Sequence, residues 1–257
     1  MSISKKKNMY WLSKKQWNPF VGCKHICIYC TSSFQRQLKR YSKKTCKACY
    51  NFTPHTHKQK LNQMLPHTPY LKFIFTCANG DIRYCRKQYF LKIIDIIRQN
   101  PDKNFLIQTK DPKKAFFFRD GKQVKFPNNV ILGITLETNR DKLYTNNFLV
   151  SKAPKPFKRY QDFLKVKHPI KMVTIEPVID FDIDIMIQWI DQINPSMVWL
   201  GYDSGNHYGK TWYPNYLPEP ELEKVREFHW RLSQGERAVV LKTIRKAWWE
   251  HACGGTT

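Results

Sequence analysis

The sequence predicts an α/β fold in which parallel strands alternate with helices around one core. The first observation is that short apolar runs rich in β-branched and aromatic residues alternate with helical patterns along most of the chain. The second is the length of 257 residues, which an α/β barrel commonly occupies and which is enough to bury one large core. We therefore expect a single domain over residues 1–257.

Six strands are expected from the apolar runs, and they cover residues 72–77, 104–109, 129–136, 170–175, 197–200 and 238–241. Helices are expected at residues 88–98, from Asp111 and Pro112 onward, at 183–193 and from 219 to about 232. Residues 88–98 carry a broad apolar stripe, and Asp111 before Pro112 has the form of an N-cap and a first-turn proline. Residues 31–69 fit neither pattern, so we expect an insertion that begins with a helix.

Polar residues or glycines follow most of the expected strands. In parallel barrels the active site is built from the carboxyl ends of the strands and the loops after them. We therefore expect one common mouth to be lined by Asn79, Gly80, Asp81, Lys110, Glu137, Asn139, Glu176, Asp203 and Ser204. Each of these residues alone could equally be a helix cap or part of a solvated turn, and their repetition at successive strand ends is the stronger signal.

Three cysteines lie close together near the N-terminus with the spacing C-x3-C-x2-C. They are Cys23, Cys27 and Cys30, and Tyr29 precedes the last thiol. Three thiolates on one short loop can ligate three irons of a [4Fe-4S] cluster and leave the fourth iron without a protein ligand. The alternative is a zinc knuckle, although zinc sites usually need a fourth ligand and pair two C-x2-C arms.

A disulfide framework is disfavoured by the expected compartment. No apolar stretch follows the N-terminal lysines as it would in a signal peptide, so we expect a cytoplasmic protein. Eight cysteines in an intracellular chain favour a role in metal binding or redox chemistry. No apolar run approaches the roughly 20 residues that span a bilayer, so no membrane partner is expected.

A second group of candidate ligands consists of Cys46, Cys49, His55 and His57, with the pattern C-x2-C-x5-H-x-H. These side chains have the chemistry of a tetrahedral zinc site. Alternatively, Cys77 and Cys85 could replace the histidines and hold an auxiliary Fe-S cluster, or the cysteines could be free thiols that pack as small apolar residues.

The chain is strongly basic, with 44 Lys and Arg against 20 Asp and Glu and a formal charge of +24. Such a charge attracts polyanions, which makes nucleic acid a candidate partner. Basic residues gather after the cysteine loop, with Phe34 and Tyr41 nearby for base stacking: Lys39, Arg40, Lys43, Lys44 and Lys47. The alternative is a solvated basic face without a partner.

The cysteine loop resembles the cluster loop of radical S-adenosylmethionine (SAM) enzymes. Several blocks together resemble an archaeal and phage-associated radical SAM-like family of unknown function, whose members carry a Trp-Asn-Pro segment before the cysteines. Here that segment is Trp17, Asn18 and Pro19. The other matching blocks are 46–57, the turn at Gly80 and Asp81, 105–112, the pair Glu176 and Pro177, and 201–205.

This resemblance implies an incomplete (β/α)6-type radical SAM barrel with a cysteine- and histidine-containing insertion at about 31–69. It assigns Cys23, Cys27 and Cys30 to a [4Fe-4S] cluster that reductively cleaves SAM to a 5'-deoxyadenosyl radical. The residues expected to bind SAM are Asn79, Gly80, Asp81, Glu137, Asn139 and Glu176. A reductant such as ferredoxin or flavodoxin is the implied partner, and the substrate is open, with nucleic acid as one candidate. The alternative from another class is a non-catalytic, zinc-stabilised nucleic-acid-binding protein.

Overall fold

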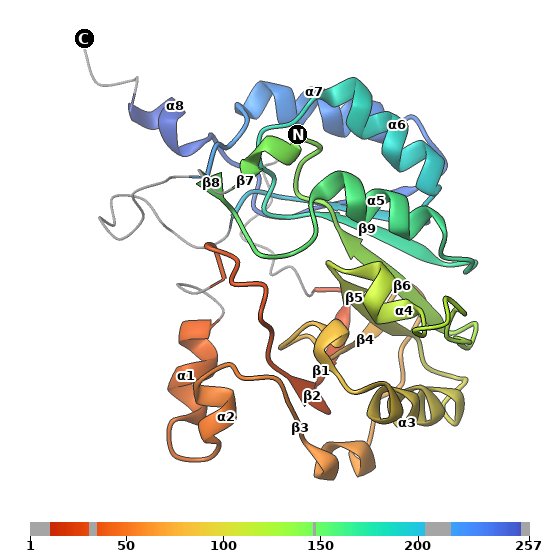
Figure 1. The fold of residues 1–257 in the computed structure, drawn as a ribbon. Coiled ribbons are helices and arrows are strands. Elements are labelled where there is room, and N and C mark those ends of the chain that lie inside the picture. Colours follow the sequence, from red (N-terminus) through yellow and green to blue (C-terminus); the bar gives the residue numbers. More distant parts are fainter. Residues whose placement is uncertain (1–10, 31–34, 146–147, 204–216, 253–257) are drawn as a thin grey trace.

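The computed structural model describes residues 11–30, 35–145, 148–203 and 217–252, and it confirms the α/β prediction. Seven parallel strands form one curled sheet in the order β1-β4-β5-β6-β9-β10-β11 (Figure 1). The strands are β1 (Ser13–Trp17), β4 (Phe73–Thr76), β5 (Phe105–Thr109), β6 (Val130–Thr135), β9 (Lys171–Ile175), β10 (Met197–Leu200) and β11 (Ala238–Leu241). Because β1 and β11 lie at the two ends of this order and do not pair with each other, the barrel is incomplete.

All six predicted strands are present, and the seventh, β1, was missed by the sequence analysis. Its sequence contains one apolar residue, Trp17, and its other side chains are exposed or half-buried. The strand pairs in parallel with β4, with an irregular register between Ser13 and Lys15. Backbone hydrogen bonds to β4 hold this edge strand in place. Because few of its side chains need to be buried, its sequence shows little apolar periodicity.

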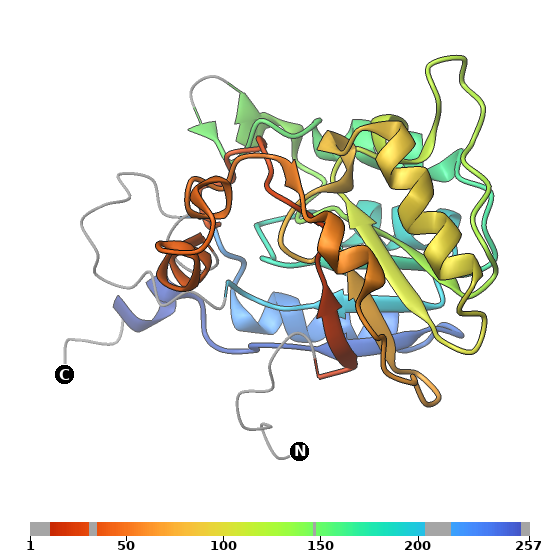
Figure 2. The same cartoon turned by 90° about the horizontal axis from the view of Figure 1, so that it is seen from below.

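Five helices pack on the same face of the sheet (Figure 1, Figure 2). They are α3 (Lys87–Arg98), α4 (Pro112–Phe116), α5 (Pro156–Leu164), α6 (Ile183–Ile193) and α7 (Leu222–Leu232). The expected cap of α4 is confirmed, because the Asp111 carboxylate accepts a 3.2 Å hydrogen bond from the Lys114 N–H. Helix α7 begins three residues later than expected, and α5 was not expected. Figure 1 also labels the short C-terminal helix α8 (Trp248–Ala252).

Alternate side chains of the strands enter two different cores. Ile74 of β4 packs with the helices, whereas Phe73 and Phe75 lie on the opposite face with Leu106 and Trp199. This second face becomes polar toward the carboxyl ends of the strands, where the Gln108 amide donates a 2.6 Å hydrogen bond to the Thr135 hydroxyl. The alternation follows from the two-residue period of a strand.

The insertion after the cysteine loop contains the helix that was predicted there. It comprises α1 (Arg36–Ser42), α2 (Lys47–Tyr50), β3 (His55–Thr56) and a 3-10 turn (Lys58–Asn62). Strand β3 pairs antiparallel with β2 (Phe20–Val21), which leads into the cysteine loop. Another short antiparallel pair consists of β7 (Tyr144–Thr145) and β8 (Phe148–Leu149). Among the described residues, no helix has both the length and the apolar character needed to cross a membrane.

Candidate metal and cofactor site

The cysteine loop is fastened to the carboxyl end of β4. Gly22, just before Cys23, forms a parallel bridge with Gly80 in the turn after β4. The Gly22 N–H donates to the Asn79 carbonyl at 2.9 Å, and the Asp81 N–H donates to the Gly22 carbonyl at 3.3 Å. This position is the edge of a parallel sheet at which active sites of such folds are assembled.

The Trp-Asn-Pro segment connects the loop, the sheet and the insertion. Trp17 is fully buried, and its indole N–H donates to the Lys60 carbonyl at 2.8 Å. The Asn18 side chain accepts a 2.8 Å hydrogen bond from the Asn79 N–H, and the Pro19 carbonyl accepts one of 2.7 Å from the His57 N–H. Each residue of the segment therefore positions a different neighbour of the cysteine loop.

The three thiols of the loop lie in a largely desolvated environment. Cys27 is only 7% exposed, and Cys23 and Cys30 are half-buried. Burial raises the pKa of the Cys30 thiol to about 12, and the neighbouring Cys27 adds to the effect. Burial likewise raises the pKa of Cys23 and Cys27. Without a metal these thiols are protonated, and a metal ion would take the place of their protons.

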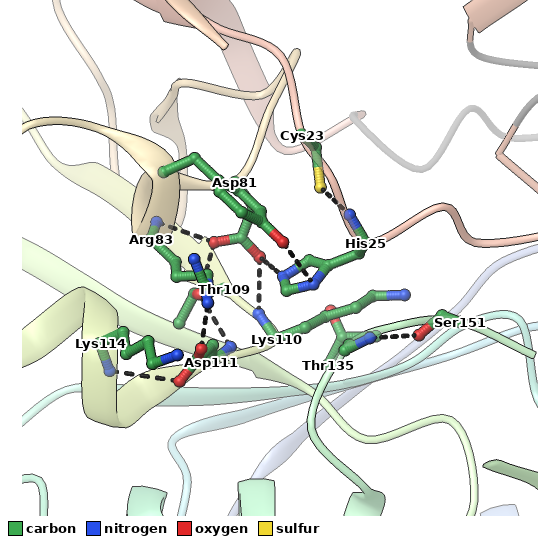
Figure 3. A network of polar contacts seen from close by, with 12 residues as sticks. Cys23, His25, Asp81, Arg83, Thr109, Lys110, Asp111, Lys114, Thr135 and Ser151 are labelled. Atoms are coloured by element: carbon green, nitrogen blue, oxygen red, sulfur yellow. Dashed lines mark hydrogen bonds and ion pairs between the residues drawn. The ribbon is translucent and has the colours of Figure 1, made fainter. Parts of the chain in front are cut away.

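Asp81 lies beneath the loop, between His25, Thr109 and Lys110 (Figure 3). One carboxylate oxygen accepts from the Thr109 hydroxyl at 2.7 Å and from the Arg83 N–H at 3.0 Å. The other accepts from the Lys110 N–H at 2.9 Å and lies 3.1 Å from His25 Nε2. Although burial raises it, these hydrogen bonds and the His25 charge hold the pKa of Asp81 below its usual value.

His25 is the loop residue that Asp81 holds. Its ring is buried, and the Tyr84 hydroxyl lies 3.2 Å from its Nδ1. Its backbone N–H donates to the Cys23 sulfur at 3.4 Å, and its carbonyl accepts a 2.6 Å bond from the Lys152 N–H. With two partners on each oxygen, Asp81 fixes the loop. Its expected contact with SAM stays a prediction.

Glu137 is the centre of a second buried network, on the other side of Cys27. Its side chain has no solvent exposure and contacts Lys110, Tyr29, Tyr144 and Arg159. The Arg159 guanidinium donates to one oxygen at 2.8 Å, and Lys110 pairs with the other. Burial lowers the pKa of Lys110 to about 8 and raises that of Glu137.

Lys110 connects this network to the cysteine loop, because its Nζ lies 3.5 Å from the Cys27 sulfur. Lys110 was expected at the mouth, but its contact with a thiol was not, and Arg159, Tyr144 and His25 were not expected in the site at all. Arg159 lies on α5, a helix that the sequence analysis did not predict, and the rule that charged residues are rarely buried argues against placing it inside.

The remaining predicted residues have separate partners. The Asn139 amide exchanges two hydrogen bonds with the Asp182 backbone, of 3.0 and 2.7 Å, at the start of α6. Glu176 pairs with Lys242, and burial raises the pKa of Glu176 to about 7 despite that cation. The Asp203 carbonyl accepts a 3.3 Å hydrogen bond from Arg245, and Ser204 lies outside the described residues. Thus the structure gathers Asp81, Lys110 and Glu137 around the cysteine loop.

The second predicted ligand group is brought together in the insertion. The ligand atoms of Cys46, Cys49, His55 and His57 all lie within 4.8 Å of one another. Within the described ranges, this is the one group of three or more His, Cys, Asp or Glu side chains placed to hold a single metal ion. Cys77 and Cys85 lie outside it.

Comparison with known proteins gives a family match and several matches to solved structures. No curated protein matches the sequence. The crystal structure of Streptococcus suis SuiB bound to precursor peptide SuiA has a TM-score of 0.49 and 12% identity, covering 90% of this chain and 48% of that chain. SuiB bound to S-adenosylmethionine has a TM-score of 0.48 and 12% identity, covering 93% and 51%. This chain therefore spans about half the length of those proteins.

The family match covers nearly the whole chain. Residues 6–253 match the family described as "Protein of unknown function (DUF5131)". The chain therefore belongs to the DUF5131 family.

Proposed function

We propose that this protein is a [4Fe-4S]-dependent radical SAM enzyme in which Cys23, Cys27 and Cys30 hold the cluster. The observation that carries the proposal is the place of these thiols, on one loop bridged to the carboxyl end of β4 in an incomplete parallel barrel. When bound, such a cluster would supply the electron that cleaves SAM to a 5'-deoxyadenosyl radical. A one-electron reductant such as ferredoxin or flavodoxin would then be a partner.

The residues around the loop fit a cluster held by thiolates. Each of the three cysteines would bind a different iron, and no fourth cysteine is needed. Lys110, 3.5 Å from the Cys27 sulfur, offsets part of the negative charge that three thiolates introduce. The His25 N–H toward Cys23 adds a hydrogen bond of the kind that tunes cluster potentials.

The chain's own residues position the loop from two sides and limit its contact with water. On one side, the turn at Asn79 and Gly80 carries the start of the loop. On the other side, the Ile28 N–H donates to the Val150 carbonyl at 3.0 Å, and the Lys152 N–H donates to the His25 carbonyl. A loop held at both ends keeps a metal cofactor in one orientation, which radical chemistry requires.

Nucleic acid is the substrate class that the surface charge favours. Five basic residues of α1, of α2 and of the turn between them are exposed to solvent: Lys39, Arg40, Lys43, Lys44 and Lys47. They lie on the insertion that carries β3, and β3 pairs with the strand leading into the cysteine loop. A phosphate backbone bound there would approach the loop. Phe34 and the side chain of Tyr41 lie outside the described residues.

The test is anaerobic reconstitution followed by counting of iron and sulfide and a dithionite-driven assay for 5'-deoxyadenosine. We expect about four irons and four sulfides per chain, together with 5'-deoxyadenosine formed from SAM. Cys27→Ala should reduce the iron content to background and abolish SAM cleavage, while the sheet remains folded. Cys85→Ser is the matched control, because Cys85 lies outside both ligand groups, and it should retain both properties.

The second candidate function is a non-catalytic, zinc-stabilised nucleic-acid-binding protein. The group at Cys46, Cys49, His55 and His57 favours it, together with the net charge of +24. It predicts colourless protein that contains zinc but no iron, even after reconstitution. Iron without SAM cleavage would instead indicate an electron carrier or a sensor, and retained cleavage in Cys27→Ala would refute the cluster assignment.

A further inference from the structure

We infer that Cys46, Cys49, His55 and His57 bind one structural zinc ion, and that this ion holds the start of the cysteine loop in place. The zinc site itself does not depend on the proposed function. Its effect on the binding of iron by the cysteine loop does rest on that function. The physical basis is the convergence of four ligand atoms from α2 and β3, next to the strand that leads into the cysteine loop.

The separations of the ligand atoms match a single tetrahedral ion. His55 Nε2 lies 3.5 Å from the Cys46 sulfur, 3.3 Å from the Cys49 sulfur and 2.9 Å from His57 Nε2. The Cys49 sulfur lies 3.1 Å from His57 Nε2. Zinc bonds of about 2.0 to 2.3 Å in a tetrahedron place ligand atoms about 3.3 to 3.8 Å apart. Two of these four separations are a few tenths of an ångström shorter than this range, and all six pairs lie within 4.8 Å, so side-chain adjustments suffice to surround one ion. Cys77 and Cys85, which an auxiliary cluster would need in place of the histidines, lie outside this group, so the arrangement favours a single ion over such a cluster.

The local hydrogen bonds prepare the ligands for zinc. His55 Nδ1 lies 2.7 Å from the Thr53 carbonyl and donates its proton there, which leaves the lone pair of Nε2 for a metal. The Cys49 N–H donates to the Cys46 sulfur at 3.4 Å, and it orients that sulfur as hydrogen bonds around metal sites orient the ligands. Binding of Zn²⁺ releases two thiol protons to solvent and gives a neutral site with two thiolates and two imidazoles. Four protein ligands leave no open position, as in structural zinc sites.

The insertion needs such an ion because it has almost no core of its own. Between residues 35 and 62, the side chains described as buried are Ser42, Cys49 and Phe52. Cys49 is itself one of the four ligands. Segments with so little buried apolar surface are commonly stabilised by a metal, whose binding energy is then folding energy.

The ligands are joined directly to the backbone that starts the cysteine loop. His55 pairs with Val21 across the β2–β3 ladder, and the His57 N–H donates to the Pro19 carbonyl. The Cys23 N–H donates to the Phe52 carbonyl at 3.4 Å. Gly22 has a φ of +102°, and a Cβ there would lie 2.4 Å from the Thr53 backbone, so the two segments are in close contact. Fixing residues 46–57 therefore fixes the position of Gly22 and Cys23.

The first experiment measures metal content in the full chain. We expect about one zinc per chain in protein purified without added iron, and Co²⁺ in its place should give the intense visible bands of tetrahedral thiolate coordination. His57→Ala and Cys49→Ser should lose most of the zinc, whereas His57→Cys, which supplies another zinc ligand, should retain it. Cys85→Ser should also retain it, as a cysteine outside the group.

The failure of this inference is distinguishable from that of the proposed function. Cys27→Ala should lose iron and retain zinc, whereas His57→Ala should lose zinc. Wild-type protein that binds neither zinc nor cobalt, or a His57→Ala, Cys49→Ser double variant with full zinc content, would overturn the zinc site. If the variants do not fold, titration of chelator-treated wild-type protein with Co²⁺ decides the question.

The second experiment measures the coupling by amide hydrogen exchange, which is independent of activity. Removal of zinc should accelerate exchange in residues 20–23 and 55–57 by about tenfold or more, because opening of β3 also releases β2. Exchange in β5 and β6, at the centre of the sheet, should change little and serves as the internal control. Unchanged exchange in residues 20–23 after zinc removal would overturn the coupling.

Discussion

At the scale of single residues, Lys110 links the cysteine loop to the buried carboxylate of the barrel. Its ammonium group contacts the Cys27 sulfur and pairs with Glu137, which also pairs with Arg159. Together these contacts place one cation next to a proposed cluster ligand in a desolvated environment. A cation in such a place favours the more negatively charged, reduced form of a cluster.

We therefore expect Lys110→Met to lower the reduction potential of the reconstituted cluster. Loss of a charge-assisted hydrogen bond of about 1.5 kcal/mol corresponds to a decrease of about 65 mV for a one-electron couple. A redox titration followed by electron paramagnetic resonance would measure it. Lys110→Arg keeps the charge and should remain closer to the wild-type potential. Equal potentials in wild type and Lys110→Met would show that Lys110 does not act on the cluster.

At the scale of elements, the turn after β4 and the strand β2 form the support of the cysteine loop. Gly80 and Gly22 pass each other so closely that a Cβ on Gly80 would lie 2.7 Å from the Gly22 carbonyl oxygen and 2.8 Å from its nitrogen. Both neighbours are backbone atoms, which cannot rotate away as a side chain can. The support therefore requires glycine at residue 80 for steric reasons.

Gly80→Ala should separate this turn from the loop. We expect it to lower the free energy of unfolding by about 1 to 3 kcal/mol and to lower the iron content after reconstitution, because Cys23 follows the displaced residue. Denaturant unfolding and iron counting would measure both effects. Gly121→Asn is the control, since Gly121 has positive φ in open space and asparagine tolerates that conformation. Wild-type stability and iron content in Gly80→Ala would contradict the steric argument.

At the scale of the whole molecule, the charge of +24 creates a field that attracts polyanions, and the exposed basic side chains of α1, α2 and the turn between them concentrate part of it. For duplex DNA, each cation that contacts a phosphate contributes about 0.9 to the slope of log binding constant against log salt concentration. The slope therefore distinguishes a defined binding surface from charge that is spread over the whole protein, because only cations in contact with phosphate contribute fully to it.

Replacing Lys39, Arg40, Lys43, Lys44 and Lys47 by glutamine should therefore reduce the salt dependence of DNA binding, by about 0.9 in slope for each contacting cation. Fluorescence anisotropy over a series of salt concentrations would measure it. Replacement of the exposed Lys113, Lys122 and Lys125, which lie elsewhere in the chain, is the matched control and should change the slope less. An equal change per charge in both variants would indicate a diffuse field without a binding face.

The sequence alone determined the features that depend on local pattern. Six strands and α6 were predicted within a few residues, because apolar periodicity reports directly which side chains face a core. The two ligand groups were also recognisable, because cysteines and histidines separated by only a few residues remain close in space however the loop folds. The sequence predicted that Cys46, Cys49, His55 and His57 belong together, and the structure brings their ligand atoms within 4.8 Å.

Only the tertiary structure decided the features that depend on contacts between distant segments. Strand β1 exists because β4 offers a free edge, and its own sequence contains little apolar pattern. Arg159 of α5 pairs in the interior with Glu137, which lies in the loop after β6, and this distant partner makes its burial possible. The Asp81 carboxylate has four partners inside the protein, which the sequence did not reveal, and its expected contact with SAM stays a prediction. The physical reason is that hydrogen-bond partners of buried polar groups come from segments far apart in the chain, and local periodicity contains no information about them.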